Sequence, residues 1–325
     1  MSRTAWGRAR LLGGAAILAV VVWRLGTGPF VEGLGRVSAW SLVAAAVIGL
    51  VTTLCAAWRW RVVARGLGVD LDLPVAVASY YRSQFLNTAL PGGVVGDVHR
   101  GVRHGREAGD VGRGLRAVAW ERFAGQSVQV ALALIVLVLL PSPVRSSMPI
   151  VVSLAAVGAF AAVLFVRTIS PHAETPLARV LRAARADLRD SLFARGSWLA
   201  ITVASVIVVA GHTATFLIAA RTAGTSASWV RLLPMAMLVL VAMALPVNIG
   251  GWGPREGVAA ALFAAAGFGA DQGVATATVY GVIVMVACLP GALVLGAAWL
   301  RRGTYDLRVP REVGVGRQPE VAVHG

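Results

Sequence analysis

The sequence contains no lysine and few charged residues of any kind. Charged side chains make up 14% of the 325 residues, hydrophobic residues make up 57%, and the mean hydropathy is +0.74. A soluble domain carries about 25% charged residues. The excess of apolar residues therefore excludes a chain folded around one soluble core, and it predicts an integral membrane protein.

Cysteine and acidic residues are also scarce. The two cysteines, Cys55 and Cys288, each stand alone in an apolar stretch, which argues against a disulfide framework, a zinc site and a redox pair. The 30 basic residues, all arginine, outnumber the 15 acidic ones. Because the arginines lie between apolar segments, they are typical of the positive-inside bias of membrane proteins, and nucleic acid is not expected as a partner.

Nucleotide-binding and hydrolytic motifs are missing as well. There is no phosphate-binding loop of the nucleotide-triphosphatase type, no metalloprotease helix motif and no nucleophile elbow. We therefore expect no ATP-driven transport by this chain alone, and the sequence predicts no cofactor, no metal and no catalytic residue.

Apolar stretches long enough to cross a bilayer are frequent, since a membrane helix needs about 20 residues. Six stand out: residues 9–26, 40–62, 118–140, 150–167, 198–220 and 273–300. The apolar part of the first, residues 11–23, follows three arginines like the core of a signal peptide, but no small-residue cleavage site follows it, and it is expected to remain as a span. Three weaker stretches, residues 75–90, 230–245 and 257–267, are either re-entrant or complete crossings.

These stretches predict an all-α fold, a polytopic membrane helix bundle of six to eight spans. It would occupy residues 1–303 as one transmembrane domain, and residues 304–325 would form a polar, disordered cytoplasmic tail. Arginine groups that begin at Arg59, Arg100, Arg179 and Arg301 should all be cytoplasmic, as should both termini, in a bacterial-type cell (inner) membrane.

This topology is self-consistent if one broken hairpin enters the membrane from the cytoplasm and another from outside. That arrangement would be an inverted repeat; eight complete crossings is the alternative. Between the spans, residues 175–195 place leucines at helical spacing and arginines on the other faces. They form either an interfacial helix against anionic head groups or a solvated linker helix.

The first glycine-rich break interrupts an apolar stretch at residues 87–100. Pro91 should end the preceding helix at Leu90, and the glycines let the main chain turn. Asp97 is expected to cap a new helix. The free amides of that helix, together with Arg100, predict a seat for an anion such as a lipid phosphate; a cytoplasmic turn before a basic surface helix is the alternative. The candidate binding residues are Asn87, Pro91, Gly92, Gly93, Gly96, Asp97 and Arg100.

The second break, residues 245–257, repeats this pattern. Pro254 suits the first turn of a helix, where Glu256 is favoured by the helix dipole. Arg255 either faces a ligand or forms a purely structural ion pair with Glu256. The candidate binding residues are Asn248, Gly250, Gly251, Gly253, Arg255 and Glu256.

A third polar cluster lies near the start of the stretch 118–140. Arg122, Gln126 and Gln129 share one helical face, while Glu121 points elsewhere. Glu121 and Arg122 are added to the binding candidates. The face either lines the same cavity as the breaks or joins helices through hydrogen bonds.

Two further candidates carry less weight. The pair Asp70 and Asp72 resembles the metal-holding acids of sugar-nucleotide transferases, but those enzymes need a soluble nucleotide-binding domain. His212 lies in the middle of a span, where it would relay protons or hydrogen-bond a neighbouring helix.

Taken in order, these motifs resemble a known family. The residues Asn87, Leu-Pro-Gly-Gly-x-x-Gly-Asp-x-x-Arg at 90–100, Glu121-Arg122, and Pro-x-x-x-Gly-Gly-x-Gly-x-Arg-Glu at 246–256 are similar to the flippase-like membrane family related to the transmembrane region of lysylphosphatidylglycerol synthase. The resemblance implies a helical membrane fold and lipid handling, since members flip aminoacylated phospholipid or are thought to move other lipid-linked head groups. Val94, Val95 and His99 depart from the usual pattern, which leaves the substrate open.

The leading hypothesis is a membrane lipid translocase without catalytic activity. Its partner would be an anionic or zwitterionic phospholipid or a polyprenyl-linked head group. Arg100 and Arg255 would hold phosphate, while Asp97, Glu121 and Glu256 would meet a cationic group or balance the arginines. The two-domain synthases carry an aminoacyltransferase domain that this sequence does not contain. The alternatives are an enzyme or accessory subunit acting on lipid-linked sugars, or a membrane anchor for a separately encoded transferase.

Overall fold

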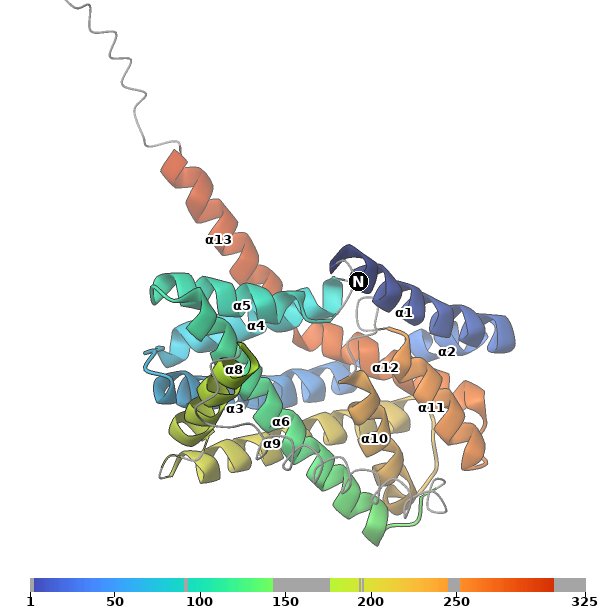
Figure 1. The fold of residues 1–325 in the computed structure, drawn as a ribbon. Coiled ribbons are helices and arrows are strands. Elements are labelled where there is room, and N and C mark those ends of the chain that lie inside the picture. The colour runs from blue at the N-terminus through green and yellow to red at the C-terminus, as the bar shows by residue number, and fades with distance from the viewer. Residues whose placement is uncertain are drawn as a thin grey trace, which may run out of the picture.

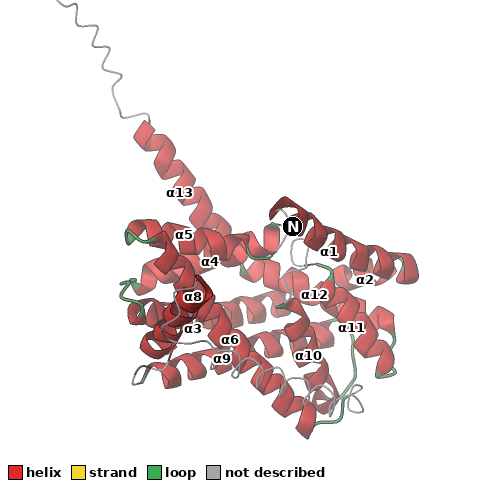
Figure 2. Cartoon of the chain, in the orientation of Figure 1, coloured by secondary structure: helices red, strands yellow, loops and turns green. Residues whose placement is uncertain are grey.

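The computed structural model describes residues 3–90, 93–142, 176–192, 194, 196–244 and 252–306. Within these ranges the chain forms helices and loops and no strand (Figure 2). Four helical stretches in them are long and apolar enough to cross a membrane: α3 (Ala39–Gly66), α6 (Val111–Leu139), α9 (Ser197–Thr222), and residues Ala270–Ala297, which comprise α12 (Ala270–Ala287) and the start of α13 (Pro290–Asp306). The predicted all-α, polytopic membrane bundle is confirmed.

The amino-terminal stretch is bent. Helix α1 (Arg3–Leu25) and helix α2 (Gly28–Gly35) meet at an angle of 93°, and the two together satisfy the length and hydropathy of one further span. Gly26 permits the bend because its φ is +70°, a left-handed conformation that favours glycine. The predicted span at residues 150–167 lies outside the described residues, so the count of six to eight spans stays a prediction.

Both glycine-rich breaks separate two packed helices. In the first, α4 (Leu73–Ala89) is followed by α5 (Val95–Glu107), and in the second, α10 (Trp229–Met243) is followed by α11 (Pro254–Ala265). Leu90 is the C-cap of α4 and Pro254 is the first residue of α11, as the sequence predicts. The stretches 230–245 and 257–267 thus fall on the two helices that flank the second break.

The helix contacts of the two halves of the bundle repeat one another. Helices α3 and α9 pack together at the centre. In the first half α5 packs on α4 and α6, and in the second α11 packs on α10 and α12. The contacts between the halves also correspond in pairs. Helix α3 contacts α12 in the same way that α9 contacts α6, and α4 contacts α13 in the same way that α10 contacts α6 (Figure 1). This correspondence between the helix contacts of the two halves supports an internal repeat. The inverted orientation of that repeat remains a prediction.

Apolar surface covers the outside of the bundle as well as its core. The largest buried cluster lies among α9, α10, α11 and α12 and includes Phe216, Leu232, Phe263 and Ile283. Only 28% of the apolar window of α3 and 17% of that of α6 is buried inside the protein. Many of the other apolar side chains of these helices, such as Val43, Val47 and Ile135, are exposed, as expected of helices that contact lipid.

Two peripheral segments complete the described chain. The amphipathic stretch forms α8 (Pro176–Asp187) and a π-helical turn, η2 (Leu188–Leu192), which packs on α3; Ser191 and Leu192 are buried while Arg185 and Arg189 are exposed. The helical prediction for residues 175–195 therefore holds over these two elements. Helix α13 projects from the bundle in Figure 1 and continues to Asp306, past the predicted domain end at residue 303. Residues 307–325 lie outside the described residues.

Candidate functional site

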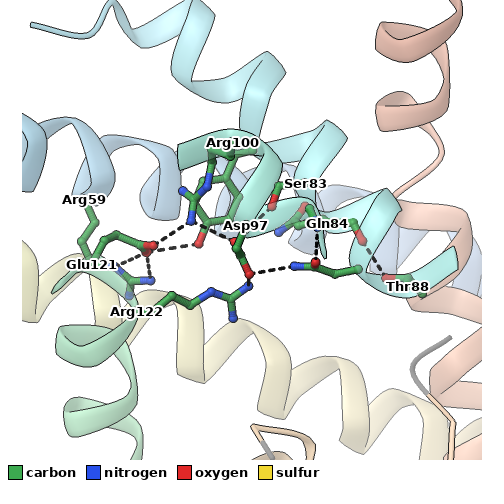
Figure 3. Close-up of polar contacts among 11 residues, drawn as sticks. Arg59, Ser83, Gln84, Thr88, Asp97, Arg100, Glu121 and Arg122 are labelled. Carbon is green, nitrogen blue, oxygen red and sulfur yellow. Dashed lines mark hydrogen bonds and ion pairs between the residues drawn. The ribbon is translucent and has the colours of Figure 1, made fainter. Parts of the chain in front are cut away.

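A buried carboxylate, Glu121, organises the centre of the first half. Arg59 on α3 donates to Glu121 Oε1 from Nε at 3.0 Å and from Nη2 at 2.5 Å, and the Tyr80 hydroxyl on α4 donates to the same oxygen at 3.1 Å. Arg100 on α5 donates to Oε2 at 3.0 Å (Figure 3). Glu121 is fully buried, and a buried charge needs such partners to offset its lost hydration.

A second carboxylate, Asp97, ties the first break to α6. Its Oδ1 accepts hydrogen bonds from Ser83 and Arg100, each at 3.0 Å, and its Oδ2 accepts from Asn87 at 2.9 Å and from Arg122. Burial by itself raises the pKa of Asp97, but Arg122 and Arg100 outweigh burial and hold that pKa below its ordinary value.

The structure corrects the role expected of Asp97 as a helix cap. Val94 occupies the N-cap position of α5, and the Asp97 carboxylate bonds to side chains on α4, α5 and α6. The break itself is held by Asn87, whose Oδ1 accepts from the Gly96 N–H at 2.7 Å. A Cβ at Gly96 would lie 2.0 Å from the Ser83 carbonyl oxygen, so only glycine allows α5 to approach α4 this closely.

Arg100 is enclosed by neighbouring side chains and does not face an open space. Its guanidinium is stacked 4.5 Å from the Trp60 ring centroid and 4.3 Å from that of Tyr80, and its side chain is 0% exposed. With Asp97 and Glu121 holding Nη2, this arginine has no open face for a phosphate. The expectation that Arg100 holds the anion is therefore replaced by a role as an internal counter-charge.

The second break holds its own buried pair. Arg255 donates to Glu256 Oε1 from Nε at 2.8 Å and from Nη2 at 2.5 Å, and the Gly253 N–H donates to Glu256 Oε2 at 2.7 Å. Gly253 has a φ of +121°. Candidates Asn248, Gly250 and Gly251, like Pro91 and Gly92 of the first break, lie outside the described residues.

One cavity of about 270 Å³ lies between the two breaks. Gly93 of the first break and Arg255 of the second both line it, as do Arg122, Gln126 and Gln129, the face of α6 that the sequence predicts. The apolar wall comes mainly from α9, α10 and α12. The other polar lining residues are Thr52, Arg59, Tyr80, Gln84, Asn87, Thr88, His212 and Tyr280.

The polar wall of this cavity is cationic. Three arginines line it, and no carboxylate does so among the described residues. Arg122 is the most accessible of the three, with 42% of its side chain exposed, against 6% for Arg59 and 4% for Arg255. Negative groups are therefore favoured in this space, where burial strengthens electrostatic interactions.

Several residues of the site are not predicted by the sequence motifs. Arg59 is expected among the cytoplasmic arginines, whereas its side chain is buried inside the bundle against Glu121 and Ser205. No motif indicates Tyr80 or Tyr280. An arginine inside a 28-residue apolar helix was the available signal for Arg59.

The weaker candidates of the sequence lie in two different cavities. Asp70 and Asp72 line a separate cavity of about 230 Å³ with His104 and Glu107, but within the described ranges no three His, Cys, Asp or Glu side chains come together to hold a metal. His212 lies in the main cavity with Nδ1 3.5 Å from the Tyr280 hydroxyl.

The fold and the site define a polytopic helical membrane protein whose internal polar cavity lies between two helix breaks. The family model described as the lysylphosphatidylglycerol synthase TM region matches residues 9–291, and the chain belongs to this family. The resemblance that the sequence motifs indicate is thus confirmed. No curated protein and no solved structure matches the chain.

Proposed function

We propose that this protein is a lipid translocase that takes a phosphate-bearing head group into the cavity between the breaks, while the lipid chains stay in the bilayer. The observation that carries the proposal is that Arg122 and Arg255 come from different halves of the bundle and line the same cavity. Membership of a family named for lipid synthesis in the membrane supports the same conclusion. The proposed activity is transport or lipid binding and not catalysis.

Arginine suits this role because its planar guanidinium binds phosphate oxygens through several parallel N–H donors. Arg122 uses Nη2 for Asp97, and Arg255 uses Nε and Nη2 for Glu256. The described residues offer Nη1 of either arginine no hydrogen bond. Each carboxylate thus positions one arginine, and that arginine keeps at least one N–H donor for a ligand.

The site would lie within a multi-pass protein of the cell membrane with both termini in the cytoplasm. Exposed arginines of the segment α8 to η2, such as Arg185 and Arg189, would then lie against anionic head groups of the inner leaflet. This orientation would place the amphipathic segment in the interface and not in the aqueous phase.

Transport is tested with vesicles of phosphatidylcholine and phosphatidylglycerol that carry a trace of fluorescently labelled phosphatidylglycerol. The fraction of label accessible to a membrane-impermeant quencher measures lipid movement. The informative variant is Arg122→Gln. Its matched control is Arg103→Gln, because Arg103 is 43% exposed, also pairs with a carboxylate, Glu107 at 2.9 Å, and does not line the cavity.

We expect wild type and Arg103→Gln to move the label and Arg122→Gln to lose at least 90% of the rate, about tenfold or 1.4 kcal/mol, while its elution volume stays that of a folded protein. Equal rates for wild type and Arg122→Gln, or no movement by the wild type in any lipid mixture, would reject the proposal.

A further inference from the structure

We infer that the head group taken by this cavity is a phosphate ester of an uncharged polyol, such as glycerol or a sugar, and not a head group that bears an amine. The inference rests on the proposed function and narrows its substrate class. It opposes the aminoacylated lipid that the family name suggests.

The three carboxylates that hold the arginines of the site already have partners within the protein. Glu121 accepts from Arg59, Tyr80 and Arg100. Asp97 accepts from four side chains, and Glu256 accepts from Arg255 and a backbone N–H. Since none of the three lines the cavity, an ammonium group entering it would find no negative partner among the described residues.

Aromatic rings bind ammonium groups elsewhere in proteins, but the rings at this site already lie against arginines. Arg100 covers the ring of Tyr80 at 4.3 Å. Arg255 lies 4.9 Å from the ring of Trp252 and 5.7 Å from that of Tyr280. A guanidinium group of the protein therefore already lies against each of these rings.

The paired charged side chains described above carry a net positive charge. Four arginines (Arg59, Arg100, Arg122 and Arg255) face three carboxylates (Asp97, Glu121 and Glu256) in the pairs described above. One positive charge is left over, and a single phosphate neutralises it. A lysyl or ethanolamine group would add a positive charge beside the arginines and repel them.

Neutral hydrogen-bonding groups fill the rest of the polar wall. Gln126 and Gln129 line the cavity, and the described residues provide no hydrogen bond to either carboxamide. Gln84 uses its Oε1 to accept from Thr53 at 3.0 Å, which leaves its amide nitrogen for other acceptors. Carboxamides both donate and accept, so they match the hydroxyl groups of a polyol, which do the same.

Two sources share this chemistry, a glycerophospholipid with a glycerol head group and a polyprenyl phosphate that carries a sugar. They are separated by binding to the full-length protein in phosphatidylcholine nanodiscs, measured by native mass spectrometry. The probes are phosphatidylglycerol, a polyprenyl-phosphate hexose, phosphatidylethanolamine and lysyl-phosphatidylglycerol. We expect one or both of the first two to bind at least tenfold more tightly than the two amine-bearing lipids.

The outcomes distinguish the inference from the function on which it rests. Preference for phosphatidylglycerol or for the polyprenyl-phosphate hexose supports the inference and identifies the source. Equal or tighter binding of lysyl-phosphatidylglycerol overturns the inference and leaves the proposed function standing. Saturable binding of none of the four probes overturns both.

A paired substitution tests the electrostatic cause. Gln126→Glu places a carboxylate in the cavity, and Gln126→Met keeps the length of the side chain without charge. We expect Gln126→Glu to shift the ratio of affinities toward lysyl-phosphatidylglycerol by at least tenfold, and Gln126→Met, which loses the carboxamide but adds no charge, to shift that ratio clearly less. An unchanged ratio in a Gln126→Glu protein that elutes as the wild type contradicts the inference.

Discussion

Arg122 on α6 and Arg255 on α11 line one cavity, and each is held by a carboxylate that is not among the residues lining that cavity. Asp97 holds Arg122, and Glu256 holds Arg255. The two arginines follow different helix breaks, so the cavity exists only when the two halves of the bundle pack together. Binding and folding therefore depend on the same buried ion pairs.

Removing the central carboxylate should destabilise the protein strongly. Glu121→Gln would leave Arg59 and Arg100 buried without their shared counter-charge, and breaking a buried pair costs about 3 to 5 kcal/mol. The midpoint of thermal unfolding in detergent measures the effect. Asp70→Asn is the control, since Asp70 is 93% exposed and its pair with Arg65 should contribute about 0 to 1 kcal/mol. Equal shifts in the two variants would contradict this assignment.

Stability should fall on acidification in a way that depends on Asp97. The pKa of Asp97 is lower in the folded protein because Arg122 and Arg100 outweigh burial, so the folded state binds fewer protons than the unfolded one. The contribution of the ionised Asp97 side chain to the free energy of unfolding is fully present above the unfolded pKa of about 3.9. It is lost as the pH falls through the lower pKa of the folded state. The gap in unfolding midpoint between wild type and Asp97→Asn should therefore narrow from pH 7 to pH 3. A constant gap would show that the Asp97 charge is not stabilised as described.

A glycine on α12 should control the position of Arg255. A Cβ at Gly281 would lie 2.3 Å from Arg255 Nη2, so Gly281→Ala must push the guanidinium away from the cavity wall. We expect lipid affinity to drop about tenfold, or 1.4 kcal/mol. Gly296→Ala is the matched control, because nothing lies within 4 Å of a Cβ at that position. Similar affinities for both variants would argue against Arg255 as a ligand.

A thiol in the cavity provides a test of occupancy. Cys288 lines the cavity and Cys55 does not, so the variant Cys55→Ser leaves one reporter thiol. A small methanethiosulfonate reagent should modify Cys288 more slowly when the bound lipid fills the cavity. Intact-mass spectrometry gives the rate with and without phosphatidylglycerol or the polyprenyl-phosphate hexose in the nanodisc. A rate that neither lipid changes would place the lipid elsewhere.

Local features of the fold and the site were predictable from the sequence. Pro91 and the glycines around it predict where α4 ends, and Pro254 predicts where α11 begins, because proline and glycine act within a few residues. The spacing of Arg122, Gln126 and Gln129 predicts a shared face, and the structure places that face in the cavity. These predictions succeed because helical periodicity relates residues three or four apart.

The partners of the charged groups were not predictable in this way. Arg59 bonds to Glu121, 62 residues away in the sequence, and its position near two other arginines resembled a cytoplasmic flank. Arg100 follows the first break as a phosphate ligand would, yet the rings of Trp60 and Tyr80 enclose it. Both assignments depend on how α3, α4, α5 and α6 pack, and one sequence carries no direct record of contacts between helices.

The most direct test is an experimental density map of the protein in nanodiscs that contain the lipid bound in the competition assay. The account predicts head-group density between α6 and α11, with phosphate oxygens within about 3.2 Å of guanidinium nitrogens of Arg122 and Arg255. A cavity that remains empty at saturating lipid, with head groups ordered only on the outer surfaces of the bundle, would contradict it.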